Sequence, residues 1–86
     1  MKVKKPSSQE IEATKNWGEW NKEPSTFPWY YDEKETCYIL SGKAEVTDLQ
    51  GNKITFTVGD WVEFEKGLSC TWKISDTIRK KYKFGE

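Results

Sequence analysis

The sequence lacks histidine entirely and has only two cysteines among 86 residues. The missing imidazole excludes Ser-His and Cys-His nucleophile pairs, acid–base catalysis by histidine and the most common ligand of transition metals. Cys37 and Cys70 lie far apart in the chain, and neither has a second cysteine nearby. This spacing excludes a zinc ribbon and a CxxC redox motif.

An excess of one charge and a long hydrophobic run are also absent. Lys and Arg total 14, as do Asp and Glu, so the formal net charge is zero. No strong field favours nucleic acid or an anionic lipid surface, and we expect neither as a partner. No apolar run follows the lysines of residues 1–6, so we expect neither a secretory signal nor a membrane span. The sequence therefore predicts a cytoplasmic protein whose two thiols stay reduced.

Hydrophobic residues are scarce, but aromatic residues are not. The hydrophobic fraction of 35% and the mean hydropathy of −0.89 are typical of disordered chains. Five Trp, four Tyr and four Phe residues argue against disorder, because each can bury about 150–250 Å² of surface in a small core. We therefore expect a folded chain with one core, since 86 residues are too few for two.

The aromatic residues all follow position 16. We therefore expect residues 1–16 to form a leader and residues 17–86 to form a single domain. Ser7 and Glu10 have the spacing of a capping box, which indicates a short helix in the leader; an extended leader is the alternative. Prolines punctuate the next stretch, residues 17–29, and favour an extended segment that covers the fold.

Apolar and polar residues alternate from position 37 onward, with the period of two that is typical of strands with one buried face. We expect turns at Gly42, Gly59 and Gly67, each with a positive φ, because the alternation breaks there. Residues 78–84 are expected to add a last strand whose lysines face solvent. About seven short antiparallel strands predict an all-β fold, either a small barrel or a sandwich.

Two motifs in this part of the chain have the spacing of the cupin superfamily. The first is Trp29-x-Tyr31-x3-Glu35-x6-Gly42, which resembles the His-x-His, Glu and Gly of metal-binding cupins. The second is Gly59-x5-Glu65-x-Gly67-x2-Cys70, which resembles Gly-x5-Pro-x-Gly-x2-His. Residues 27–31 and 66–72 are similar to small single-domain RmlC-like cupins related to the cupin domain of (S)-ureidoglycine aminohydrolase. The resemblance covers residues 17–84 and implies a jelly-roll barrel with a pocket in its mouth.

The positions that hold the metal in such cupins differ here. They are Trp29, Tyr31, Glu35 and Cys70, of which Glu35 alone matches the family motif. Indole has no lone pair for a metal and a neutral phenol is a poor ligand. We therefore expect a degenerate site without metal or other cofactor, in which Glu35 and Cys70 are the weak metal-ligand candidates.

The barrel mouth is the expected ligand site, and it contains residues that could bind or react. Glu35 is a candidate acid or base, because a carboxylate among aromatic rings has a raised pKa. Cys70 is the candidate nucleophile. Both also have structural alternatives, since rings can plug a small barrel and buried thiols are often core. The predicted ligand-binding residues are Trp29, Tyr31, Glu35, Cys37, Cys70 and Trp72.

Three functions stay open, and the sequence favours the first. This is a small-molecule-binding cupin whose ligand is unknown. The second is a small metal-assisted enzyme acting on a ureide-like or other nitrogenous metabolite, as the resemblance implies. The third is a homodimeric interaction module that docks through Trp17 and Trp20. An oligonucleotide-binding barrel also fits the size and the aromatic residues, but the motif spacing disfavours it.

Overall fold

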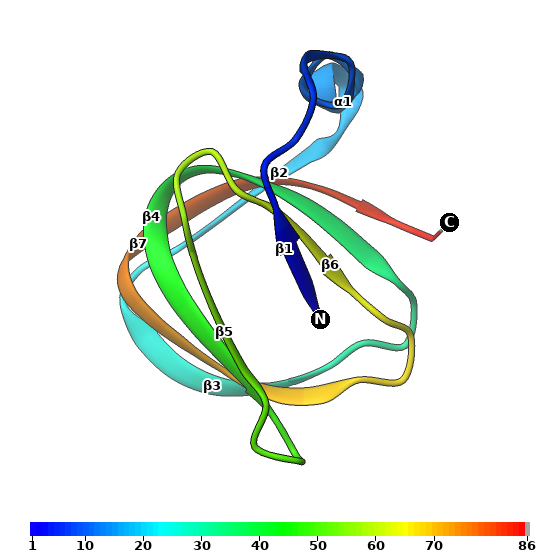
Figure 1. The fold of residues 1–86 in the computed structure, drawn as a ribbon. Coiled ribbons are helices and arrows are strands. Elements are labelled where there is room, and N and C mark those ends of the chain that lie inside the picture. Colours follow the sequence, from blue (N-terminus) through cyan, green and yellow to red (C-terminus); the bar gives the residue numbers. More distant parts are fainter. Residues whose placement is uncertain (86) are drawn as a thin grey trace.

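The computed structural model describes residues 1–85 as seven antiparallel strands that curve into a barrel, with a short helix outside it (Figure 1). The prediction of an all-β jelly roll is confirmed. Glu86, the last residue of the predicted domain, lies outside the described residues. The strands are β1 (Lys2–Lys4), β2 (Gly18–Lys22), β3 (Ser25–Tyr30), β4 (Glu35–Asp48), β5 (Lys53–Thr57), β6 (Trp61–Phe64) and β7 (Ser69–Phe84).

Two long strands, β4 and β7, hold the barrel together by pairing along most of their length. The first part of β4 also pairs with β6, and its second part pairs with β5. The first part of β7 also pairs with β3, and its last part pairs with β2. Strand β1 extends the sheet beyond β6. Because both long strands change neighbours midway, they carry the sheet around the barrel (Figure 1).

The bend in β4 falls at Gly42, where the sequence predicted a turn. That part of the prediction is wrong, because residues on both sides of Gly42 stay paired with β7 and only the register shifts. Gly42 has a φ of 96°, as expected for a glycine at a β-bulge. The positive φ expected at Gly59 and Gly67 is confirmed, with values of 87° and 88°. Residues 78–84, predicted as a separate last strand, are instead the second half of β7, which runs without interruption from Ser69 to Phe84.

The core is built around aromatic rings. Tyr31 stacks on Phe64 with ring centroids 4.7 Å apart, and Phe64 lies 5.6 Å from Trp72. The Phe56 ring packs edge-on against Trp72 at 5.4 Å. All four side chains are almost completely buried. A few large aromatic rings therefore supply much of the apolar contact area in a chain with few aliphatic side chains.

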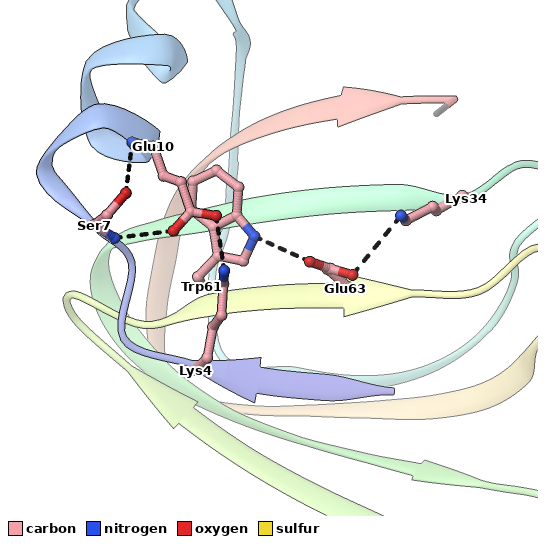
Figure 2. A network of polar contacts seen from close by, with 6 residues as sticks. All are labelled: Lys4, Ser7, Glu10, Lys34, Trp61 and Glu63. Carbon is pink, nitrogen blue, oxygen red and sulfur yellow. Dashed lines mark hydrogen bonds and ion pairs between the residues drawn. The ribbon is translucent and has the colours of Figure 1, made fainter.

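The N-terminal segment is joined to the barrel by the pairing of β1 with β6 and by an ion pair of 2.7 Å between Lys5 and Asp60. Within the segment, Lys4, Ser7 and Glu10 form a set of polar contacts (Figure 2). The capping box is confirmed at the start of α1 (Ser8–Ala13), because Ser7 and Glu10 exchange hydrogen bonds of 2.9 and 3.1 Å. Lys4 donates to Glu10 at 2.7 Å. The leader also contains β1, a strand that the sequence analysis missed because three residues show too little alternation. No helix among residues 1–85 is long and apolar enough to cross a membrane.

Trp17 and Trp20, the two residues that the sequence suggested for docking, pack partly against other rings of the barrel. The Trp17 ring lies 5.3 Å from Trp61, and the Trp20 ring lies 6.0 Å from Trp72. Both side chains are half-buried. The extended segment predicted here largely forms β2 and β3, which pair with opposite ends of β7. Trp20 lies on β2, and Trp17 immediately precedes that strand.

Candidate functional site

A cavity of about 210 Å³ lies between β2, β3, β4 and β7. Most of the side chains around it are aromatic, and the two charged ones are a carboxylate and an ammonium. Such a lining offers a planar molecule apolar walls and few polar contacts. The lining residues are Trp20, Phe27, Trp29, Tyr31, Glu35, Trp72, Lys80, Tyr82 and Phe84.

Strand alternation and register bring the two charges together. Glu35 and Cys37 are two residues apart on β4, so they lie on the same face. On β7, Lys80 lies opposite Ile39, and Tyr82 lies opposite Cys37. A lysine is long enough to reach its diagonal neighbours on the sheet face. The Lys80 side chain therefore extends along the inner face of the barrel, past Cys37 to Glu35.

The Glu35–Lys80 ion pair is buried. The Lys80 Nζ lies 3.2 Å from Glu35 Oε1 and 3.1 Å from Oε2, and both side chains are 5% exposed. The prediction that the lysines of this strand face solvent is wrong for Lys80, because β7 lies between β4 and β2 rather than at an edge. Lys80 follows Ile78 at the inward phase of the strand, and its charge is neutralised there by Glu35.

Aromatic faces and a thiol complete the surroundings of the Lys80 ammonium. Its Nζ lies 4.7 Å from the ring centre of Trp20 and 4.9 Å from that of Trp72. It also donates to Cys37 Sγ at 3.5 Å. An ammonium group over the faces of indole rings gains cation–π attraction, which is larger in a desolvated site than in water.

Tyr31 is held as a neutral phenol. Its oxygen accepts a hydrogen bond from Trp72 Nε1 at 3.1 Å. Burial raises the pKa of Tyr31 well above its ordinary value, and the nearby Glu35 carboxylate raises it further. A phenolate at this position is therefore strongly disfavoured near neutral pH.

The two thiols are also held in the protonated form. Burial raises the pKa of Cys37 far above its ordinary value, although the Lys80 charge opposes the shift. Burial raises the pKa of Cys70 to about 11, and the Asp48 carboxylate adds to the effect. The Cys70 thiol donates to the backbone oxygen of Trp29 at 3.6 Å. Neither environment supplies the thiolate that nucleophilic chemistry requires.

The six predicted ligand-site residues do not all reach the cavity. Trp29, Tyr31, Glu35 and Trp72 line it, whereas Cys37 and Cys70 do not. Cys37 lies against the Lys80 ammonium, and Cys70 packs in the core beside the backbone of β3.

Sequence analysis missed five lining residues, of which Lys80 matters most. The signal for it is the period-two pattern on β7, in which Lys80 shares a phase with the apolar Ile78 and with Tyr82. The other missed residues are Trp20, Phe27, Tyr82 and Phe84.

Comparisons with known proteins agree with this architecture. The sequence profile described as the EutQ-like cupin domain matches residues 10–82. The chain belongs to the EutQ-like cupin domain family. A DUF861 family protein from Thermotoga maritima is 46% identical to this cupin, with 96% of this chain and 97% of that chain covered and a TM-score of 0.93. No curated protein matches the sequence.

More distant structures share the fold. The EutQ protein of Clostridium difficile is 22% identical, with 79% of this cupin and 53% of that chain covered and a TM-score of 0.73. A putative ethanolamine utilization protein Q from Salmonella typhimurium is 19% identical, with 96% and 67% covered and the same TM-score of 0.73. This cupin thus spans about half of the Clostridium difficile protein.

Many cupins hold a divalent metal in the barrel, but the residues of this cupin do not fit one. Residues 1–85 bring no three His, Cys, Asp or Glu side chains together at a point where an ion could bind. Both oxygens of Glu35 accept from the Lys80 ammonium, which is itself a cation. A metal ion needs three or four donors and would meet the positive charge of Lys80 at this carboxylate.

Proposed function

We propose that this cupin binds a small, planar, neutral molecule rich in N–H donors in the aromatic cavity. The observation that carries the proposal is the pairing of a largely aromatic wall with one buried carboxylate and one buried ammonium. The rings offer stacking surface, and the two opposite charges sum to zero, so a charged ligand has no counter-charge there.

The hydrogen bonds of the ion pair favour a ligand that donates. The Lys80 ammonium has three N–H groups, and its three contacts are the two oxygens of Glu35 and the sulfur of Cys37. Each carboxylate oxygen of Glu35 can accept further hydrogen bonds. A planar amide, urea or ureide could therefore stack on Trp29 and Trp72 while it donates to Glu35.

The ureide class also agrees with the resemblance to the cupin domain of (S)-ureidoglycine aminohydrolase. We extend the proposal to binding and not to hydrolysis, because the metal on which that enzyme depends does not fit the residues here. The cytoplasmic location and the homodimer remain predictions. Light scattering tests the second of them, and a monomeric mass would contradict it.

A thermal-shift screen tests the binding proposal. The panel contains small ureides, planar amides and N–H-bearing heterocycles, each matched to a carboxylic acid or ester of similar shape without N–H donors. We expect at least one N–H donor to raise the melting temperature, whereas its matched analogue does not. Silence across the whole panel would contradict the proposal.

Two variants locate the binding site of any compound that raises the melting temperature in the screen. Trp29→Ala removes a half-exposed wall of the cavity, and we expect it to weaken binding by about three- to tenfold, the worth of one aromatic contact. Tyr30→Ala is the matched control, because Tyr30 is 59% exposed and does not line the cavity. Equal affinity of the wild type and Trp29→Ala would place the ligand elsewhere.

A further inference from the structure

Lys80 has the surroundings of a bound ion. The nitrogen is held by two carboxylate oxygens at 3.1 and 3.2 Å and by a sulfur at 3.5 Å. Two indole faces, of Trp20 and Trp72, cover it from within 5 Å. Its side chain is 5% exposed, so these protein groups replace almost all of its water.

These contacts converge on the carboxylate that the cupin motif retains. Glu35 is the one residue of this chain that matches the metal-ligand pattern of the first motif. In the structure, its carboxylate holds a positive charge, and that charge belongs to the neighbouring strand β7. Cys37, a residue with a metal-ligating atom, contacts the same nitrogen. Glu35 and Cys37 therefore surround a position suited to a cation, and the ammonium group of Lys80 occupies it.

We infer that the Lys80 ammonium is the built-in cation of this barrel and that it excludes a divalent metal from Glu35 and Cys37. The ammonium and a metal ion would compete for the same oxygen and sulfur atoms, and their positive charges repel each other. Removing the lysine side chain would uncover a carboxylate, a thiol and the space between them. A thiophilic divalent ion could then bind to both oxygens of Glu35 and to the thiolate of Cys37, with water completing its donors, and the proton of Cys37 would pass to solvent. This inference stands independently of which ligand the cavity takes.

Cobalt(II) titration of tag-free protein tests the inference. Thiolate–cobalt bonds give a charge-transfer band in the near ultraviolet, which reports Cys37 directly. We expect no such band in the wild type and about one equivalent of cobalt with the band in Lys80→Ala. The double variant Lys80→Ala, Cys37→Ser should lose the band. Lys81→Ala is the matched control, because Lys81 is adjacent on β7 but has the opposite strand phase, and it should behave as the wild type.

Two further measurements guard against an unstable variant. Lys80→His keeps a side chain in the space and adds a neutral nitrogen donor, so it should bind cobalt at least about tenfold more tightly than Lys80→Ala. Cobalt should also raise the melting temperature of either variant and leave that of the wild type unchanged. A stoichiometric thiolate–cobalt band in the wild type would overturn the inference. So would Lys80 variants that show neither the band nor a cobalt-dependent rise in melting temperature.

Discussion

The Glu35–Lys80 pair places two opposite charges inside a barrel whose other buried residues are mostly apolar. Removing two charges from water costs several kcal/mol for each ion, and their attraction offsets this cost only while both are present. The indole faces and the thiol add compensating contacts for Lys80. Stability at this point therefore depends on keeping the pair complete rather than on either charge alone.

Single substitutions in the pair should be far more costly than the double substitution. Lys80→Met or Glu35→Gln leaves one uncompensated buried charge, and we expect either to lower the free energy of unfolding by about 3–5 kcal/mol. The double variant Glu35→Gln, Lys80→Met removes both charges and should recover most of that loss. Urea unfolding of the four proteins, followed by Trp fluorescence, measures the coupling. Additive losses would show that the two residues act independently.

The sequence allowed some residues of the site to be predicted and not others. Trp29, Tyr31 and Glu35 could be assigned to the site because they occupy positions of the first motif, and Trp72 because it is an aromatic residue two positions after the second motif. Lys80 could not be, because its charge argues for solvent while its strand phase argues for burial. Which argument wins depends on a partner 45 residues earlier in the chain. Local patterns do not contain that pairing.

At the level of elements, the two long strands also depend on pairing between distant parts of the chain, which local sequence patterns do not contain. Alternation on both sides of Gly42 predicts strands correctly, but it does not say whether the break between them is a turn or a bulge. The answer lies in β7, which runs alongside β4 and stays paired with it across the break. The short β1 could not be found locally, because its pairing with β6 is made across about sixty positions of sequence.

Gly42 and Gly59 form a matched pair that tests the role of the bulge. Both have a positive φ, 96° and 87°, so alanine strains the backbone at each, by about 1–2 kcal/mol. At Gly42, a Cβ atom would also lie 2.1 Å from the backbone oxygen of Thr77, whereas at Gly59 it would meet nothing within 4 Å. We therefore expect Gly42→Ala to destabilise the protein by about 2 kcal/mol or more beyond Gly59→Ala.

Urea midpoints of the two variants, compared at equal slope, give this difference. An equal loss of unfolding free energy in the two variants would mean that β4 and β7 can move apart at the bulge to make room for the Cβ atom without destabilising the protein. That result would contradict the view that the bulge locks the two long strands together.

At the scale of the whole molecule, two buried thiols and a buried phenol make stability depend on pH in the alkaline range. Burial raises the pKa of Cys70 from 9.0 to about 11, and it raises the pKa values of Cys37 and Tyr31 in the same direction. Above pH 9, the unfolded chain releases these protons while the folded barrel retains them. The unfolded state then binds fewer protons than the folded state, so the free energy of unfolding falls as the pH rises.

We therefore expect stability to be fully present below about pH 9 and to decline through about pH 11, with Cys70 contributing about 1–3 kcal/mol to the loss. Urea unfolding under a reducing agent, at a series of pH values from 8 upward, measures the slope. Cys70→Ser is the informative variant, because serine does not titrate in this range and its packing is similar. Its stability should fall less steeply than that of the wild type between pH 9 and about 11. Parallel curves for the two proteins would show that Cys70 ionises as readily in the barrel as in the unfolded chain. That result would contradict the conclusion that burial raises the pKa of Cys70.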